Sequence, residues 1–193
     1  MDDCGELDLN RLPTLLDTRT RLLSITHTSN AIGTINPIKD IVALAHEKNI
    51  PVFVDGAQSA PHMPVNVQEL DCDFYAFSGH KLYGPMGIGA LYVKEDLLKN
   101  LIPYQSGGGM ISTVSFDDTQ YAEGPEKFEA GTPNVVGAIA LGAAIDYLLA
   151  IGLDTISTHE KSLMRQAEHL LAKVPGLKRI GHPAKHVAVY SMV

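Results

Sequence analysis

The fold is decided by Val52-Phe53-Val54-Asp55-Gly56-Ala57-Gln58, an apolar run that passes directly into an acid and an amide. The run Phe74-Tyr75-Ala76-Phe77-Ser78-Gly79-His80-Lys81 repeats this arrangement, with a hydroxyl, an imidazole and an amine at its end. Short apolar runs of this kind are typical of central parallel strands. Because parallel strands end at the same edge of a sheet, the two sets of polar side chains should meet there. The two runs therefore predict an α/β sheet with a ligand site at the carboxyl ends of its strands.

The segments beside these runs extend the sheet. Leu22–Thr26 predicts a further strand, and the stretch after it predicts a helix that Asn36 caps and Pro37 begins. The apolar residues of this helix recur on one face and are Ile38, Ile41, Val42 and Ala45. Strand, helix and strand form a βαβ unit, whose crossover should be right-handed. Ile88–Val93 predicts a fourth strand, which the close turn Gly84–Gly87 allows to run antiparallel.

The second half of the chain is predicted to be mostly helical. A glycine-rich stretch, Tyr104–Glu129, precedes a helix at Val135–Leu149 and another that begins near Asp154 and ends before Pro175-Gly176. His186–Val193 predicts a final strand. We therefore predict an incomplete three-layer αβα large domain over residues 1–152. Residues 153–193 should form a connecting helix and the start of a small second α/β domain.

Composition excludes several classes of protein. Hydrophobic residues make up 45% and charged residues 19% of the chain, as in ordinary globular proteins. The net charge of −7 and the lack of a basic stripe argue against a nucleic-acid partner. Cys4 and Cys72 have no paired spacing, which suits a reducing compartment, and the acidic start Met1-Asp2-Asp3 is unlike a secretory signal. Val135–Ile151 approaches membrane-span length but contains Asp146, so we expect a buried helix. The sequence predicts a cytoplasmic protein without a membrane segment.

The acid and the amine at the sheet edge suit a pyridine cofactor that carries an aldehyde. A lysine in a partly desolvated pocket loses its proton more easily and can form a Schiff base with an aldehyde, which is the role we predict for Lys81. An aspartate beside the pyridine nitrogen keeps that nitrogen protonated, so that the ring can stabilise a carbanion. We predict this second role for Asp55.

The neighbouring polar residues suit the rest of such a cofactor. Ser78 and His80 flank Gly79, whose backbone permits close approach, and both can donate hydrogen bonds to a phosphate. Gln58 and Asn30 can donate to the phenolic oxygen of the ring. Taken singly, each of these residues has a commoner explanation as a turn cap, a surface charge or a structural side chain. Their combination at one sheet edge predicts pyridoxal 5′-phosphate (PLP) as the cofactor.

Two blocks of sequence carry a resemblance to a known family. Val54-Asp55-Gly56-Ala57-Gln58-Ser59 and Phe77-Ser78-Gly79-His80-Lys81-Leu82-Tyr83-Gly84-Pro85 closely resemble the class V aminotransferase superfamily of PLP enzymes. Further matches lie at His27–Asn30 and Phe128–Asn134. Within the superfamily the chain is most similar to the cysteine desulfurases that supply sulfur for iron–sulfur cluster assembly, and selenocysteine lyase is a close relative. The resemblance covers nearly the whole chain and implies the PLP-transferase-like fold.

The resemblance also implies a role for individual residues. Lys81 matches the lysine that binds the cofactor and moves protons during the reaction, and Asp55 matches the partner of the ring nitrogen. Gln58 and Asn30 match the contacts to the ring oxygen, and Ser78 and His80 match the phosphate ligands. Thr132 matches a residue that reaches the phosphate of the neighbouring subunit, and the Ser106–Met110 loop resembles another element offered across that interface. The resemblance therefore implies a homodimer with shared active sites.

Several groups that the family uses have no match in this chain. The histidine that stacks on the ring and a further phosphate-binding threonine belong to sequence expected before Met1. The cysteine that receives the sulfur and the arginine that binds the substrate carboxylate belong to a domain expected beyond Val193. We therefore expect an internal fragment of a longer enzyme, with an unpaired apolar strand edge and a stability that depends on a partner chain.

The implied reaction converts L-cysteine into L-alanine and passes the sulfur to an enzyme cysteine and then to an acceptor protein. Selenocysteine lyase and another class V enzyme remain alternatives, because substrate choice depends on groups outside the chain. A function of another class is a non-catalytic subunit that retains the cofactor pocket as a scaffold. The chain by itself is expected to be inactive.

Overall fold

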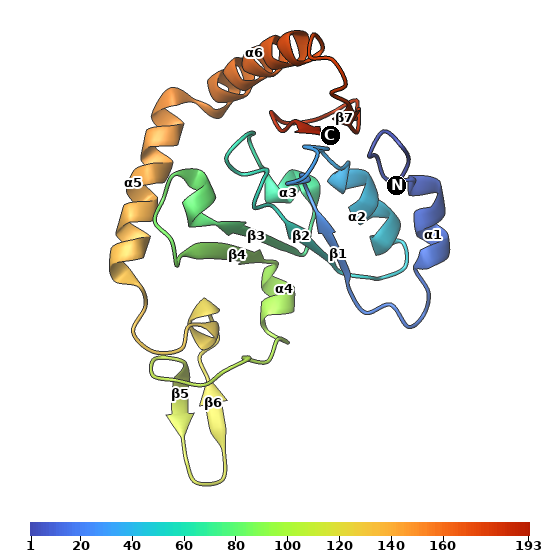
Figure 1. Ribbon diagram of the computed structural model, residues 1–193. Coiled ribbons are helices and arrows are strands. Elements are labelled where there is room, and N and C mark those ends of the chain that lie inside the picture. The colour runs from blue at the N-terminus through green and yellow to red at the C-terminus, as the bar shows by residue number, and fades with distance from the viewer.

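Four strands form the main sheet of the molecule, for which a computed structural model describes residues 1–193. They are β1 (Leu23–Thr26), β2 (Val52–Asp55), β3 (Phe74–Ser78) and β4 (Gly89–Val93), in the spatial order β1-β2-β3-β4 (Figure 1). The first three strands are parallel, and β4 returns antiparallel to β3. The predicted strands and the antiparallel return of the fourth are thus confirmed.

The register of the parallel strands decides which side chains share a face. Thr26 pairs with Asp55, and Asp55 pairs with Ala76. Because strand residues two apart point to the same face, Ser78 lies on the same side of the sheet as Asp55. The acid at the end of β2 and the hydroxyl at the end of β3 therefore face the same side at the same edge.

The hydrophobic core lies on the opposite face of the sheet. It packs against a 3-10 helix η1 (Leu9–Arg11) and the helices α1 (Leu12–Leu15), α2 (Ile38–His46) and α3 (Val67–Leu70). The fully or nearly fully buried members include Ile38, Ile41, Val42, Ala45, Val52, Val54, Cys72 and Tyr75. The apolar face predicted for α2 is confirmed, because its four periodic residues are all buried.

The start of α2 differs from the prediction. Pro37, not Asn36, occupies the N-cap position, and no side chain caps the helix. Asn36 is buried, and its Nδ2 donates instead to the carbonyl oxygen of Thr26 at 2.7 Å. The prediction that Asn36 caps the helix is wrong, because this side chain ties the helix start to the end of β1.

The second face of the sheet carries fewer neighbours. Phe53 and Phe74 are only partly buried there, with ring centroids 6.1 Å apart, whereas Asp55 and Leu91 are exposed. The edge of β4 has no partner strand, and Gly89 to Leu91 are exposed. The mixed α/β fold is confirmed, and this chain supplies the sheet together with helices on one of its faces.

A hairpin follows the main sheet and projects away from it (Figure 1). After α4 (Glu95–Leu98), the strands β5 (Ile111–Val114) and β6 (Thr119–Tyr121) pair antiparallel, and a 3-10 helix η3 (Pro125–Phe128) follows. Apart from Tyr121, which is partly buried, every residue from Ile111 to Tyr121 is exposed. The glycine-rich stretch thus contains a hairpin that its sequence pattern did not predict.

Two long helices, α5 (Val135–Ile151) and α6 (Leu153–Leu171), close the chain's helical part as predicted. Only Gly137, Leu141 and Leu148 of α5 are buried, and Val136 and Ile139 are 79% and 70% exposed. The prediction that this segment is a buried helix is wrong, because one side packs near the 3-10 helix η2 (Gly79–Leu82) and the other has no neighbouring element. No single helix has the length and hydropathy of a membrane span; α5 and α6 reach them only as a pair bent by 73°.

The C-terminal residues return beside the N-terminal ones (Figure 1). The strand predicted at His186–Val193 is wrong for most of its length, since only β7 (Arg179–Ile180) and β8 (Ser191–Met192) pair. The intervening backbone instead bonds to the loop after β1, for example from Ile35 N to Lys185 O at 2.9 Å and from Val187 N to Gly33 O at 3.0 Å. The division of the chain at residues 152 and 153 stays a prediction.

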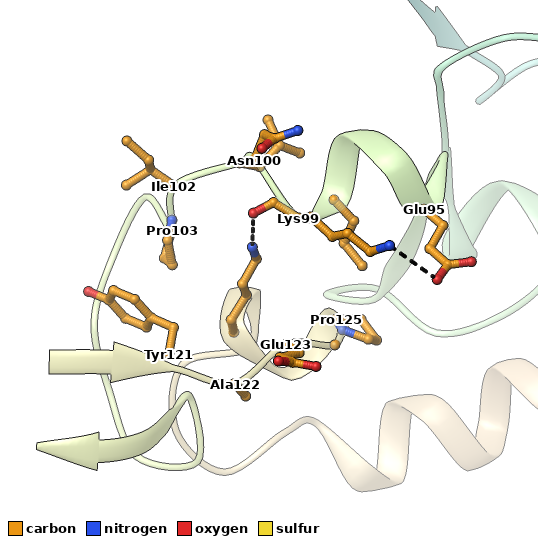
Figure 2. A pocket seen from close by; sticks show the side chains of 13 residues that line it. Glu95, Lys99, Asn100, Ile102, Pro103, Tyr121, Ala122, Glu123 and Pro125 are labelled. Atoms are coloured by element: carbon orange, nitrogen blue, oxygen red, sulfur yellow. Dashed lines mark hydrogen bonds and ion pairs between the residues drawn. The ribbon is translucent and has the colours of Figure 1, made fainter.

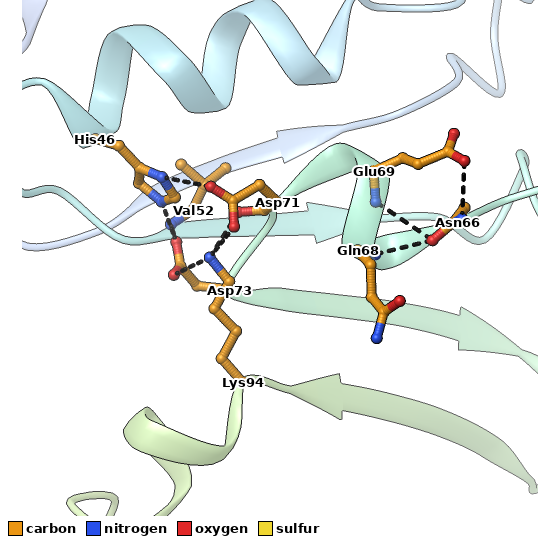
Figure 3. Close-up of polar contacts among 8 residues, drawn as sticks. All are labelled: His46, Val52, Asn66, Gln68, Glu69, Asp71, Asp73 and Lys94. Atoms are coloured by element: carbon orange, nitrogen blue, oxygen red, sulfur yellow. Dashed lines mark hydrogen bonds and ion pairs between the residues drawn. The ribbon is translucent and has the colours of Figure 1, made fainter.

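A charged cluster lies at the amino ends of β2 and β3, opposite the predicted site (Figure 3). His46 Nε2 contacts Asp73 Oδ2 at 2.8 Å, and the same oxygen accepts from Val52 N at 2.7 Å. Lys94 Nζ lies 2.5 Å from Asp71 Oδ1, and this hydrogen bond holds the pKa of Asp71 below its usual value. These contacts join α2, β2 and the end of β4, so we assign the cluster a structural role.

Candidate active site

Asp55 ends β2 with its side chain exposed. Its Oδ1 accepts a hydrogen bond from Ala57 N at 2.9 Å, which orients the carboxylate at the start of the following turn. Its carbonyl oxygen accepts from His27 N at 2.8 Å, so the pairing of β1 and β2 continues past the end of β1. The carboxylate forms no ion pair within the chain and is available to a ligand.

Lys81 comes from η2, which begins directly after β3. The turn is tight: Gly79 N donates to Ile88 O at 2.8 Å, and Gly84 N donates to Gly79 O at 3.0 Å. A Cβ on Gly79 would lie 2.9 Å from Ile88 O, so only glycine fits here without a shift of the neighbouring strand. Tyr83 ends η2 in the left-handed conformation, with φ 61°. This turn places Lys81, which is partly buried, immediately beyond the end of β3.

The other predicted residues lie in loops at or near the same edge. Asn30 follows β1 and is exposed, Gln58 lies in the turn after β2 and is partly buried, and His80 is exposed in η2. The side chains of six candidates form no hydrogen bond or ion pair within the chain, namely Asn30, Gln58, Ser78, His80, Lys81 and Thr132. Their donors are therefore free for a ligand. The convergence of all seven candidates on one ligand stays a prediction.

Thr132 lies apart in the sequence, between η3 and α5, and is exposed. Its neighbour Gly131 donates a backbone hydrogen bond to Gly108 O at 2.9 Å. This bond fastens the Ser106–Met110 loop beside Thr132. The two elements that the family resemblance assigned to contacts across a subunit interface are thus adjacent.

A large cavity lies elsewhere, between α4, the segment 99–103 and the chain from β6 to η3 (Figure 2). Its volume is about 880 Å³. The buried Lys127 is one of its lining residues and donates to Lys99 O at 3.3 Å. No residue predicted to bind the cofactor lines this cavity. We therefore assign it no role in binding the cofactor.

The strand exits fit a phosphorylated pyridine aldehyde. Asp55 offers an unpaired carboxylate, Ser78 lies on the same face at the same edge, and Lys81 supplies a primary amine from the next turn. Gly79 lets the backbone pass close to its neighbours without a side chain in the way. This donor set could hold a phosphate, a ring nitrogen and an aldehyde, which are three of the four polar groups of PLP.

The two cysteines differ in burial. Cys72 is fully buried, and this burial raises the pKa of its thiol to about 11. Cys4 is exposed. The interpretation of Cys72 as a packed side chain is confirmed. Neither residue lies in the strand-exit loops that carry the candidate site.

Alkylation should therefore distinguish the two thiols. Because only the thiolate attacks iodoacetamide, the folded chain at about pH 8 should be modified at Cys4 and spared at Cys72. Peptide mass spectrometry before and after unfolding in urea measures both sites. Rapid modification of Cys72 in the folded chain would show that the core around β3 opens readily, contrary to the packing described above.

The sheet order, the acid after β2 and the lysine turn after β3 form the arrangement expected of a PLP-dependent α/β enzyme. A family model agrees: Aminotransferase class-V matches residues 1–193. The chain therefore belongs to the class V aminotransferase family, whose members depend on PLP.

Within this family, the chain is similar to several cysteine desulfurases. A cysteine desulfurase of Escherichia coli O127:H6 is 55% identical over 180 residues, which are 93% of this chain and 44% of that protein. The crystal structure of the cysteine desulfurase CsdA from Escherichia coli matches with a TM-score of 0.91 and 42% identity, over 96% of this chain and 46% of CsdA. The apo structure of a cysteine desulfurase from Thermococcus onnurineus NA1 matches with a TM-score of 0.93 and 40% identity, over 100% of this chain and 48% of that one. The chain spans about half the length of these relatives.

Sequence reasoning assigned no role to His27 and Tyr75, which form a buried pair beneath the site. His27 Nδ1 lies 3.0 Å from Tyr75 Oη, and the two rings meet edge to face. Burial lowers the pKa of His27 to about 4, so this imidazole is neutral at pH 7. The signal that could have found the pair is strand alternation: Tyr75 falls on the buried face, where its hydroxyl needs a partner.

Lowering the pH should destabilise the folded chain, because His27 binds a proton more readily when the chain is unfolded. Its folded-state pKa of about 4 lies below the value of about 6.5 expected when unfolded, so the unfolded chain binds more protons between these values. The contribution of His27 to the free energy of unfolding should be constant above about pH 6.5 and fall by about 3 kcal/mol towards pH 4. Urea unfolding at several pH values measures this, with His27→Asn as the control that should lose this part of the slope. Equal slopes in both proteins would contradict the assignment.

Proposed function

We propose that this chain is the cofactor-binding part of a PLP-dependent cysteine desulfurase. The enzyme would convert L-cysteine into L-alanine, while an enzyme thiol takes the sulfur and becomes a persulfide. One observation carries the cofactor assignment: β2 and β3 end side by side with Asp55 and Ser78 on one face, and the turn bearing Lys81 follows directly. The similarity to cysteine desulfurases supports the choice of reaction.

Each proposed role follows from the chemistry of the side chain. When bound, PLP draws electrons away from the α carbon of an amino acid, which makes the α proton removable. Lys81 holds the cofactor through its aldehyde and carries the α proton. Asp55 accepts the hydrogen bond of the protonated ring nitrogen, and Gln58 and Asn30 donate to the ring oxygen.

Phosphate binding completes the proposed site. Ser78 and His80 donate to the cofactor phosphate within the chain. Thr132 would donate to the phosphate of a second copy, so that two chains share their sites in a homodimer. Support for the last point comes from the exposure of Thr132 and from the hydrogen bond that joins its loop to the Ser106–Met110 segment. In the cell, the sulfur would pass to an acceptor protein for iron–sulfur cluster assembly.

Two other functions use the same residues. A selenocysteine lyase or another class V enzyme would need the same contacts to PLP and differ in groups that recognise the substrate. A non-catalytic scaffold would bind the cofactor but move no proton. The test must therefore detect the proton step itself.

Exchange of the α hydrogen of L-cysteine tests this step without requiring sulfur transfer. The PLP-loaded full-length protein that contains this chain is incubated with L-cysteine in D₂O, and the α-hydrogen signal is followed by NMR, with Lys81→Ala as the matched control. We expect the signal to fade with the wild-type protein and to persist with the variant. A persistent signal in the presence of loaded wild-type protein would refute the desulfurase proposal and favour the scaffold. In the same full-length protein, faster exchange with selenocysteine than with L-cysteine would favour the selenocysteine lyase.

A further inference from the structure

Four buried polar side chains lie beneath the strand exits. They come from β3 and from the loops after β1 and β2, and they are His27, Thr28, Ser59 and Tyr75. None is more than 5% exposed. Two contacts pair them across elements: His27 Nδ1 with Tyr75 Oη at 3.0 Å, and Thr28 Oγ1 with Ser59 Oγ at 2.7 Å. His27 and Thr28 are adjacent in the sequence, and this links the two pairs.

These side chains attach directly to the backbone that carries the acid. His27 N donates to Asp55 O at 2.8 Å, and Ser59 N donates to Gly56 O at 2.9 Å. Gly56 rests on the Tyr75 ring so closely that a Cβ at residue 56 would overlap it. Tyr75 therefore packs against Gly56, the residue that follows Asp55.

The network spans the segments that carry three of the predicted cofactor contacts. The sheet register fixes Asp55, but Asn30 and Gln58 lie in loops beyond the strands, where no ladder hydrogen bond determines their position. Thr28 is close in sequence to Asn30, and Ser59 is adjacent to Gln58. The Thr28–Ser59 contact therefore fixes the distance between the two loops.

Stability alone gives little reason for such a network. Replacing both partners of a buried hydrogen bond by apolar groups of the same shape is often nearly neutral, whereas a fully bonded polar network fixes one geometry. Every buried polar side-chain atom here has a partner, as a geometry-fixing network requires.

We propose that His27, Thr28, Ser59 and Tyr75 are positioning residues that hold Asp55, Gln58 and Asn30 in the arrangement that binds the PLP ring. This rests on the proposed function, because it presumes that these three residues contact the cofactor. The four residues themselves touch no cofactor and act only through the loops that they join.

Two variants remove one hydroxyl each while keeping the shape of the side chain. Tyr75→Phe leaves the ring beneath Gly56, and Thr28→Val leaves a branched side chain facing Ser59. The matched control is Tyr92→Phe, because Tyr92 pairs with Tyr75 in the sheet, is partly buried and makes no side-chain hydrogen bond. The four proteins are titrated with PLP, and the visible circular dichroism of the bound cofactor reports the orientation of its ring.

We expect Tyr75→Phe and Thr28→Val each to weaken PLP binding about fivefold and to change the visible circular dichroism band at saturation. Tyr92→Phe should change neither. A network that is merely structural would lower the melting temperature of the first two variants but leave the affinity and the band as in the wild type, and this result would overturn the proposal. Failure of the wild-type protein to bind PLP would instead refute the proposed function.

Discussion

Lys81→Ala should abolish covalent attachment of PLP. Lys81 follows β3 in a turn that its neighbours fix tightly, and no ion pair occupies its ammonium group. Treating the PLP-loaded chain with borohydride makes a lysine-linked pyridoxyl group permanent. Intact mass spectrometry should then find one added group on the wild-type chain and none on the variant.

The same substitution should remove proton transfer. A positioned acid–base group contributes about 10²–10⁴-fold to a rate, so α-hydrogen exchange in Lys81→Ala should fall by about this factor. Lys81→Arg keeps the positive charge but cannot form the link, and it should behave like the alanine variant. Lys161→Ala, an exposed lysine on α6, is the control that should retain both properties. An adduct that persists in Lys81→Ala would mean that another lysine holds the cofactor.

Asp55→Ala should have the second largest effect. The carboxylate is exposed, unpaired and oriented by Ala57 N, so it is ready to accept a charge-assisted hydrogen bond. Such bonds contribute about 1.5–3 kcal/mol, which corresponds to PLP binding that is about 10–100-fold weaker in the variant. Fluorescence titration of PLP measures the affinity.

Protonation of the cofactor provides the independent readout for Asp55. With ¹⁵N-labelled PLP, the ring nitrogen should be protonated at neutral pH in the wild-type protein and deprotonated in Asp55→Ala, because a nearby carboxylate favours the cation. Asp117→Ala removes an exposed carboxylate from the hairpin and should leave the affinity and the nitrogen signal unchanged. If the nitrogen has the same protonation state in Asp55→Ala, the assigned role of this residue is wrong.

The sheet was predictable because its signals are local. Val52–Asp55 and Phe74–Ser78 are apolar runs bounded by polar residues, and α2 shows a helical period on one face. Asn36 was misjudged because a side chain near a helix start has other acceptors, here Thr26 O. The burial of α5 was predicted wrongly because its high hydropathy favours a buried helix, whereas its actual burial depends on which elements pack against it.

Local sequence patterns likewise predicted some residues of the candidate site and not others. Asp55 and Ser78 follow from the rule that parallel strands end at one edge, and Lys81 follows from its position after β3. Asn30 was indicated by its place after the predicted first strand. Thr132 lies in a loop whose course no local pattern determines, so only the family resemblance indicated it. The His27–Tyr75 pair joins residues far apart in sequence, and a single strand pattern can show that Tyr75 is buried without showing its partner.

The central claim is that a carboxylate from β2 and an amine from the turn after β3 reach opposite ends of one PLP ring. A crystal structure of the borohydride-reduced, PLP-loaded protein tests it most directly. The account predicts a bond from Lys81 Nζ to the cofactor and an Asp55 carboxylate oxygen about 2.7–2.9 Å from the ring nitrogen. A ring attached to another residue, or one whose nitrogen faces away from Asp55, would contradict it.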